Sequence, residues 1–452
     1  MSVGRITVVG GGLAGIAAAL SCADAGAEVT LVEVRPRLGG AAYSFERDGM
    51  VLDNGQHVFL RCCTAYRALL DRLGTASATT MQPRLSIPVI APGGRVEWLR
   101  RTSLPAPLHL AGALTRYGHL SMRERVGAAR TALALSRLDL DDEGLDDRTF
   151  GAWLSEHGQS TAAVDALWNL IALPTLNLRA DEASLAMAGF VFQTGLLNHA
   201  SAGDVGYARL PLSAIHGDPS AQALRAAGVD VRTGWRAERL EATPPGEFSV
   251  LGAADETLES DAVIVALPHA RALGFLPDDA LADPSRLERL GASPIVNLHI
   301  VYDRRVTDFD LAAGVRSPVQ WLFDRTGESG LTDGQHLAIS LSGADREAGM
   351  TRDELRDQYL PALRELLPRA RDARVERFEV VREHHATFRS APGIRKLRPG
   401  PRTRIDGLTL AGAWTATEWP ATMEGAVRSG LAAARETLGA RGAAPLAEVT
   451  AA

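Results

Sequence analysis

A glycine-rich turn near the start of the chain sets the first constraint on the fold. The turn GGGLAG at residues 10–15 places its glycines in GxGxxG spacing. It follows a β-rich run at 6–9 and opens an alanine-rich run at 13–25, and a second apolar run at 28–33 comes next. These patterns predict a strand, a helix and a strand in turn. Residues 5–33 therefore form a predicted βαβ unit.

Each glycine of this turn has a use in binding a dinucleotide. The first permits a tight turn, the second lets backbone N–H groups approach a pyrophosphate, and the third permits close helix–strand packing. The phosphates are expected at the helix N-terminus, where unpaired N–H groups and the helix dipole favour an anion. Glu33 ends the second strand, where a carboxylate binds two ribose hydroxyls and favours an unphosphorylated ribose over that of NADP. The residues predicted to bind the dinucleotide here are Gly10, Gly12, Leu13, Ala14, Gly15 and Glu33.

Composition excludes several classes of protein. The chain has 452 residues, of which 46% are hydrophobic and 23% charged, as in globular proteins of two or three domains. The net charge is −6 and the basic residues are spread along the chain, so we expect no nucleic-acid partner. Lys396 is the single lysine, which leaves little room for chemistry that needs a neutral lysine.

Cysteine usage and the N-terminus indicate a cytoplasmic protein. Cys22, Cys62 and Cys63 form no CxxC pair, and adjacent cysteines rarely make a structural disulfide. The chain enters a strand at once, without the basic segment or cleavage site of a secretion signal. No apolar run reaches the roughly 18 residues of a spanning helix, and no metal-ligand spacing is present. Peripheral contact with the inner face of the cell membrane stays open, with the stretch at 103–135 as its candidate.

Further along, strand-like and helical segments alternate, which predicts an α/β fold. Helical periods dominate between about 80 and 204, and a helix is also expected over 64–73. The remaining expectations are strands at 229–233, 261–267 and 407–411 that return to the first sheet, strands at 295–302 and 337–342 of another sheet, and helices at 352–367 and 421–438.

Three segments carry a resemblance to a known family. RPRLGG (35–40), DNGQH (53–57) and LTLAGAWTATEWPATMEGAVRSG (408–430) resemble the motifs of FAD-dependent amine oxidases, phytoene-type desaturases and protoporphyrinogen oxidases. The resemblance implies a Rossmann-like FAD-binding domain of the GR2 type, with an inserted α+β substrate-binding domain, and non-covalent FAD. It adds these expected cofactor contacts: Arg35, Arg37, Leu38, Gly39, Gly40, Asn54, Gly55, Gln56, His57, Ala237, Gly412, Ala413, Met423 and Glu424.

The same resemblance implies how the chain divides. Segments 1–79, 205–290 and 400–440 are assigned to a discontinuous FAD-binding domain. Segments 80–204 and 291–399 are assigned to the substrate-binding domain with its helical insertion, and 441–452 to a flexible C-terminal tail.

Several positions depart from branches of this family. Amine oxidases hold a lysine over the flavin where this chain has Asn297, and an aromatic residue of their amine cage where it has Thr422. No cysteine follows Cys63, so the covalent flavin link of that branch is absent. Desaturases usually carry an acid after Ala-Gly, in contact with the ribityl chain, where this chain has Ala413. The departure implies weaker flavin binding, or another group that replaces the contact.

A narrower resemblance concerns the substrate. DNGQHVFLRCCTAY (53–66), LWNLIALPTLNLRADEAS (167–184) and ARLPLS (208–213) resemble the hydroxysqualene dehydroxylases of bacterial squalene and hopanoid synthesis. This implies an oxidoreductase acting on CH or CH2 groups, which replaces an allylic hydroxyl with hydrogen by using reduced flavin. The helical segment would then enclose a long isoprenoid, and other enzymes of squalene synthesis are candidate partners. Two alternatives stay open: a phytoene- or carotenoid-type desaturase, and a non-catalytic prenyl-binding protein similar to GDP-dissociation inhibitors.

Loss of the hydroxyl requires a proton donor in a dry site. His57 is the first candidate, because a histidine titrates near neutral pH, and Gln56 is the second; structural roles beside the flavin are equally open for both. Asn177, Trp414 and Trp419 are candidate substrate contacts. For Asn177 the alternative is a turn or a helix cap, and for the tryptophans it is packing against the cofactor.

Overall fold

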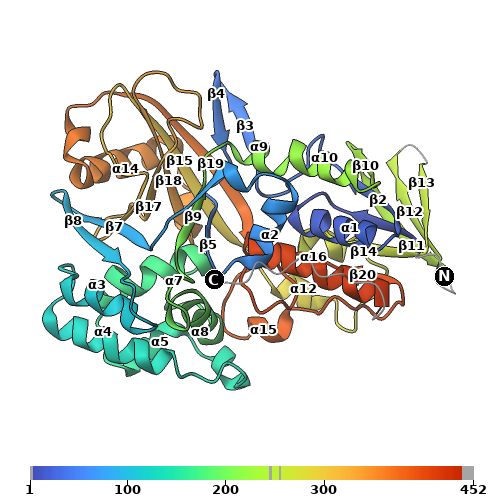
Figure 1. Cartoon of the computed structure of the whole chain (residues 1–452), viewed down its shortest axis with the longest axis horizontal. Helices are drawn as coiled ribbons and strands as arrows, with labels where there is room; N and C mark the ends of the chain where they lie inside the picture. Colours follow the sequence, from blue (N-terminus) through green and yellow to red (C-terminus); the bar gives the residue numbers. More distant parts are fainter. Residues whose placement is uncertain (1–3, 244–246, 254–255, 440–452) are drawn as a thin grey trace.

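The computed structural model describes residues 4–243, 247–253 and 256–439, so the tail predicted at 441–452 lies outside the described residues (Figure 1). Its first sheet has five parallel strands in the order β10-β2-β1-β14-β20. The strands are β1 (Arg5–Val9), β2 (Glu28–Glu33), β10 (Asp230–Thr233), β14 (Ala262–Val265) and β20 (Leu408–Leu410). The predicted return of three distant segments to the first sheet is confirmed.

This sheet is covered on both faces. Alternate residues of β1 point to opposite sides: Ile6 and Val8 pack with the helices α1 (Leu13–Asp24) and α16 (Met423–Leu438), in the core that also holds α2 (Thr64–Arg72). Val9 packs on the other side with Phe248 and Val250. Those residues belong to an antiparallel sheet of β11 (Ala237–Thr243), β12 (Glu247–Gly252) and β13 (Thr257–Ser260). The result is the layered Rossmann-type arrangement that the sequence predicts.

Helix α1 is tied closely to α16. A Cβ on Gly430 of α16 would lie 2.1 Å from the carbonyl oxygen of Ala14, so glycine is required for this approach. The C-terminal helix therefore lies directly beside the first helix of the dinucleotide-binding unit (Figure 1).

A second sheet has seven strands in the order β19-β15-β18-β17-β16-β7-β8. Val296, Leu298 and Ile300 of β15 (Ser293–Tyr302), the second strand in this order, pack with α14 (Arg352–Leu366). The alternate residues Asn297 and His299 therefore point to the opposite face, toward the segment that follows Asp53. The strands are β7 (Ser86–Ala91), β8 (Arg95–Arg100), β15 (Ser293–Tyr302), β16 (Leu311–Gly314), β17 (Trp321–Asp324), β18 (Gln335–Ser342) and β19 (Val375–Thr387).

The prediction of helical structure from about residue 80 is wrong at its start. Residues 86–100 form the hairpin β7–β8, which joins the edge of the seven-stranded sheet, because two runs that hold β-branched and aromatic residues flank a turn with Gly93 and Gly94. The helical segment begins later and packs around Phe150, Trp168 and Phe192. Its helices are α3 (Ala111–Arg116), α4 (Met122–Leu135), α5 (Phe150–Glu156), α6 (Thr161–Ala163), α7 (Asn169–Leu176) and α8 (Leu185–Phe192).

Short elements connect these parts. The hairpin of β3 (Ser44–Arg47) and β4 (Met50–Asp53) leads into the DNGQH segment. A small sheet joins β5 (Val58–Leu60), β9 (Val205–Ala208) and β6 (Thr79–Met81). Short helices are α9 (Leu212–His216), α10 (Asp218–Ala226), α11 (His269–Leu273), α12 (Ser285–Arg289), α13 (Asp345–Ala348) and α15 (Ile394–Leu397). Among the helices of the described ranges, none is long and apolar enough to cross a membrane. We keep the domain boundaries given above as a proposal.

Candidate active site

The N-terminus of α1 is built to accept an anion. Its N-cap residue is Gly12, so no side chain caps the first N–H groups of the helix. A Cβ on Gly40 would lie 2.7 Å from Cα of Gly12, and one on Gly15 would lie 1.9 Å from the carbonyl oxygen of Gly10. Gly39 donates its N–H to the carbonyl of Gly11 at 2.9 Å. The two glycine turns therefore meet at the helix N-terminus without side chains between them.

Glu33 ends β2 beside this turn. Its Oε2 accepts the N–H of Gly11 at 2.7 Å, and its Oε1 accepts the N–H of Arg35 at 2.8 Å. These bonds fix the carboxylate, and each oxygen keeps a lone pair for a ribose hydroxyl. Ala237, the predicted adenine contact, begins β11, two residues after Trp235, which donates its backbone N–H to the carbonyl of Glu33. Its contact with adenine stays a prediction.

Two guanidinium groups lie near the same place. Nη1 of Arg35 and Nη1 of Arg37 lie 3.4 and 3.3 Å from the carbonyl oxygen of Gly40. Arg37 also stacks on the ring of Tyr43, with 3.7 Å between its Cζ and the ring centroid. Burial and the neighbouring charge of Arg35 lower the pKa of Arg37. Neither arginine forms an ion pair with a carboxylate in the part of the chain that the structure describes, so a diphosphate fits between these cations and the bare helix N-terminus.

The DNGQH segment is held by its asparagine. Nδ2 of Asn54 donates to the carbonyl of Ala41 and to Oε1 of Glu383, both at 2.9 Å, and Oδ1 accepts the N–H of Tyr43. The backbone carbonyl of Asn54 accepts a hydrogen bond from Nδ2 of Asn297 at 3.0 Å. Oδ1 of Asn297 is buried and has no hydrogen-bond partner among the described residues. The side-chain amide of Asn297 is thus held by one hydrogen bond and keeps an unused acceptor.

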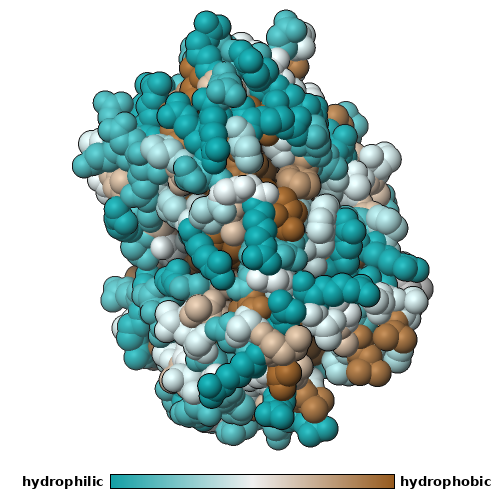
Figure 2. All heavy atoms as spheres, turned by 90° about the vertical axis from the view of Figure 1, so that its left-hand side faces the viewer, coloured by the Kyte–Doolittle hydropathy of each residue, from teal (hydrophilic) through white to brown (hydrophobic). Residues whose placement is uncertain are grey.

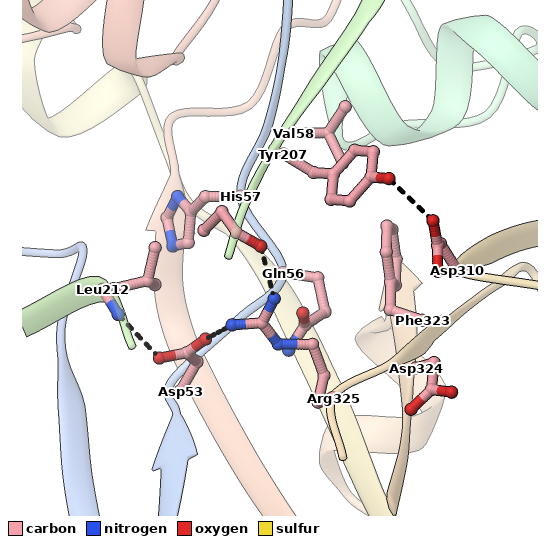
Figure 3. Close-up of a pocket in the computed structure, with 11 residues that line it drawn as sticks. Asp53, Gln56, His57, Val58, Tyr207, Leu212, Asp310, Phe323, Asp324 and Arg325 are labelled. Carbon is pink, nitrogen blue, oxygen red and sulfur yellow. Dashed lines mark hydrogen bonds and ion pairs between the residues drawn. The ribbon is translucent and has the colours of Figure 1, made fainter. Parts of the chain in front are cut away.

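Asp53 and Arg325 form a buried ion pair next to this segment. Nη2 of Arg325 lies 2.7 Å from Oδ2 of Asp53, and its Nη1 donates to the carbonyl of Ala208 at 2.8 Å. Oδ1 of Asp53 accepts the N–H of Leu212 at 3.0 Å. Figure 3 shows the pair at the centre of a small pocket, with His57 on one side and Phe323 on the other.

His57 and Gln56 line this pocket. Burial lowers the pKa of His57, and the carboxylates of Asp53 and Glu383 oppose that shift. Nε2 of Gln56 is buried without a hydrogen-bond partner among the described residues. Both predicted catalytic residues therefore face one pocket, and Gln56 keeps an unused donor there. Their catalytic roles stay predictions.

A second histidine lies behind His57. His216 is fully buried, its Nε2 is 2.8 Å from the hydroxyl of Tyr66, and its Cβ lies against the Gly39 turn. Burial and the proximity of His57 lower its pKa to about 3. His216 is therefore neutral at physiological pH and joins the glycine turn to helix α2.

The C-terminal segment contributes the N-terminus of α16. Met423 begins this helix and is buried. The carboxylate of Glu424 accepts the N–H groups of Ala65 and Tyr66, at 3.1 and 2.7 Å, and pairs with Arg428 at 2.6 Å. Glu424 therefore caps helix α2. Its carboxylate is occupied by these bonds within the protein. Its role at FAD stays a prediction.

Known proteins resemble this chain in sequence and in fold. The model of the family described as flavin-containing amine oxidoreductase matches residues 13–438. The chain belongs to this family. The structure of a double mutant of putrescine oxidase has a TM-score of 0.71 at 19% identity over 96% of this chain and 99% of that one. Cyclohexylamine oxidase from Brevibacterium oxydans has a TM-score of 0.72 at 18% identity, over 96% and 98%.

Two curated relatives of this flavin amine oxidoreductase are closer in sequence than those structures. Hydroxysqualene dehydroxylase from Rhodopseudomonas palustris is 29% identical over 443 residues, which cover 96% of this chain and 98% of that protein. A probable zeta-carotene desaturase from Synechococcus elongatus is 27% identical over 97% and 99%. The protein is an FAD-dependent oxidoreductase, as the sequence predicts.

The hydrogen bonds of Asn177 give it a structural role in this oxidoreductase, and its contact with the substrate stays a prediction. Asn177 ends α7 in the left-handed conformation and is buried. Its Nδ2 donates to the carbonyl of Ser293 and the hydroxyl of Thr387, and its Oδ1 accepts the N–H of Gly343. Because both amide hydrogens are used, a substrate could bind them only by breaking a bond between α7 and the second sheet.

The two tryptophans predicted at the substrate differ in their surroundings. Trp414 is buried and donates its indole N–H to the carbonyl of Leu267 at 2.9 Å. Trp419 is half-buried, with an edge-on contact to Phe190 of α8 and the guanidinium of Arg428 at 5.2 Å from its ring. Trp419 therefore contacts the helical segment directly.

Sequence reasoning missed two charged residues of this site. Arg325 and Glu383 lie 272 and 329 positions from their partners Asp53 and Asn54, in strands and loops of the second sheet. No local motif marks either residue. The one available signal is a buried-strand pattern that ends on Asp53, which predicts a carboxylate in need of a cation.

Proposed function

We propose that this oxidoreductase is a hydroxysqualene dehydroxylase, which converts hydroxysqualene to squalene in squalene and hopanoid synthesis. The main support is the 29% identity to the Rhodopseudomonas palustris enzyme of that name along nearly the whole of both chains. Enzymes of the same name from Sinorhizobium fredii and Zymomonas mobilis are 28% and 25% identical. The substrate is then a long isoprenoid with an allylic hydroxyl.

The reaction consumes one proton and one hydride for each molecule. The carbon–oxygen bond breaks, the hydroxyl leaves as water after it takes up a proton, and a hydride is added to the carbon. Reduced FAD supplies the hydride when bound. The protein must therefore exclude water around the carbon, orient it, and deliver a proton at the hydroxyl oxygen.

His57 and Gln56 are the proposed partners of the hydroxyl. Nε2 of Gln56 is a buried donor without a partner, which suits a hydrogen bond to the departing oxygen. In the same role His57 gives up a proton readily when charged, because burial lowers its pKa. The site has no lysine, which supports a reaction without an amine base; the chain's single lysine pairs with Asp147.

A carotenoid-type desaturase is the second candidate, supported by 27% identity to the probable zeta-carotene desaturase. Its reaction would run in the opposite direction, with hydride leaving a substrate carbon for oxidised FAD. Purified holoenzyme should be given hydroxysqualene under reducing conditions, and phytoene or zeta-carotene under oxidising conditions, with extraction of the lipids. Squalene as the sole product supports the dehydroxylase, and new conjugated double bonds support the desaturase. A protein that binds isoprenoids but changes neither substrate would leave only the non-catalytic alternative.

We also propose that the protein contacts a membrane through the surface of residues 103–135. The exposed apolar side chains Leu104, Leu108, Met122, Val126 and Leu133 lie in this stretch, which supplies five of the eight large apolar residues exposed in the described part of the chain. Figure 2 shows apolar side chains among polar ones at the lower edge of the face that carries this stretch. The segment has four arginines against one glutamate, in a protein of net charge −6. This combination suits an anionic lipid surface.

Vesicle sedimentation tests this surface. Holoenzyme should co-sediment with vesicles of phosphatidylcholine and phosphatidylglycerol, and salt should weaken the binding. Substitution of Leu108 and Met122 by glutamate should abolish it, whereas Leu210→Glu, at an equally exposed position outside the stretch, should not. Equal vesicle binding by the unmodified protein, the variant with Leu108 and Met122 replaced, and Leu210→Glu would contradict the proposal.

A further inference from the structure

A buried arginine organises the loop between β20 and α16. Arg398 is 4% exposed, and its guanidinium faces the carbonyl oxygens of Ala413, Trp414, Thr415 and Trp419 and the hydroxyl of Thr417. The distance from Nη2 to the Trp419 oxygen is 2.8 Å. Its Cζ also lies 4.8 Å from the centroid of the Phe388 ring. One side chain thus donates hydrogen bonds to five acceptors of the loop between β20 and α16.

This arrangement orients the other side of the loop. Because the carbonyls of Ala413 and Trp414 turn toward Arg398, the N–H groups of the loop are free to face away from it. The N–H groups of Ala413 and Trp414 have no acceptor among the described residues, although Trp414 is buried. The neighbouring N–H of Gly412 is bound by Oγ of Ser429 at 2.8 Å, which fixes the start of the loop.

The charge of Arg398 has no carboxylate partner. No ion pair of Arg398 occurs within residues 4–243, 247–253 and 256–439. Burial lowers the pKa of Arg398 to about 10, so the group is still charged at neutral pH. A buried cation satisfied by dipoles alone creates a positive potential around the loop, which favours an anionic ligand there.

We infer that Arg398 is a positioning residue for FAD: it shapes the loop of residues 412–419 so that the N–H groups of Ala413 and Trp414 bind the cofactor. This accounts for the lack of an acid at Ala413, because backbone donors held in place by Arg398 replace the missing side-chain contact. The inference needs FAD as the cofactor and is independent of the substrate proposed above.

FAD binding to the apoprotein tests this role, measured by quenching of flavin fluorescence. Arg398→Met should raise the Kd for FAD about tenfold or more, because the N–H groups of Ala413 and Trp414 are then no longer held toward the cofactor. Arg398→Lys keeps the charge without the planar guanidinium group. Its Kd for FAD should lie between those of the unmodified protein and Arg398→Met. Arg402→Met is the matched control, because Arg402 is close in sequence and pairs with Glu436 on the surface, and its Kd should not change.

The thermal stability of the apoproteins separates positioning from simple stabilisation. If Arg398 only stabilises the fold, Arg398→Met lowers the melting temperature but leaves the Kd for FAD unchanged at temperatures below unfolding. That result would overturn the inference. If Arg398→Met does not fold, Arg398→Lys and Thr417→Val carry the test, since Thr417→Val removes a single acceptor. A Kd equal to that of the unmodified protein in both would also overturn it.

Discussion

Nη2 of Arg325 and Oδ2 of Asp53 form an ion pair at 2.7 Å in which both side chains are less than a tenth exposed. Asp53 ends β4, directly before the DNGQH segment, and Arg325 follows β17 of the second sheet. The pair therefore connects the hairpin β3–β4 to the seven-stranded sheet at the pocket lined by His57 and Gln56. Glu328 lies 3.2 Å from Nη1 of the same arginine and is also buried. Loss of Arg325 therefore leaves two buried carboxylates without compensation.

Arg325→Met is expected to destabilise the protein by about 3–5 kcal/mol, the usual result when one partner of a buried pair is removed. Chemical denaturation of the apoprotein measures the change. The double variant with Asp53→Asn should be less destabilised than the two single variants together, because it removes both charges. Strictly additive effects would show that the two residues do not interact.

Glu33→Gln is expected to weaken FAD binding about tenfold or more. The substitution removes the charge that receives the N–H groups of Gly11 and Arg35 and the predicted ribose hydroxyls. Fluorescence titration of the apoprotein measures the Kd. Glu28→Gln is the matched control, because Glu28 is exposed at the other end of the same strand and should have no effect. Equal affinities of the two variants would remove Glu33 from the cofactor site.

The rate of hydroxysqualene reduction should depend on the protonation of His57. Asp53, Glu383 and His216 are the titratable groups that influence His57, and its folded pKa lies below 6.5. The charged form is therefore present only in acid, and the single-turnover rate should fall about tenfold per pH unit above that pKa. His57→Gln should remove this dependence. A pH profile that is unchanged in the variant would exclude His57 as the proton donor.

Three buried histidines should make the fold sensitive to acid. Burial lowers the pKa of His216 and His299 to about 3 and that of His336 to about 4, against 6.5 for an ordinary histidine. As the pH falls below about 6.5 the unfolded chain binds protons first, so stability is full above this pH and declines toward pH 4. Melting temperatures between pH 7 and 4 should show this decline. His216→Gln, which can keep the bond to Tyr66, should reduce the slope, and a stability independent of pH would contradict the account.

Local sequence patterns were enough to predict the first sheet. The turn at residues 10–15 and the runs beside it determine a βαβ unit through contacts between neighbours in the chain, and the structure has this unit at Arg5–Glu33. The hairpin Ser86–Arg100 was missed because its strands are short and partly exposed, which makes the apolar alternation weak. Strand Val375–Thr387 was missed for a similar reason, since most of its side chains are polar.

The site was predictable only in part. Glu33 and the residues of the DNGQH segment follow from motifs, and the structure brings His57 and Gln56 to one pocket. Arg325 and Glu383 do not follow from any motif, because their roles arise from packing between segments far apart in the sequence. Arg398 lies 15 to 21 positions before the carbonyl groups that it binds, and no motif marks it.

A single anaerobic turnover in D2O tests the central claim most directly. The protein should be reduced with dithionite, mixed with hydroxysqualene, and followed by the flavin spectrum and by mass spectrometry of the extracted lipid. We expect the flavin to be reoxidised and an equivalent amount of squalene to form. This squalene should carry one deuterium at the carbon that lost the hydroxyl, because the hydrogen that reduced flavin transfers exchanges with solvent. Flavin that stays reduced with unchanged hydroxysqualene would contradict the proposed function.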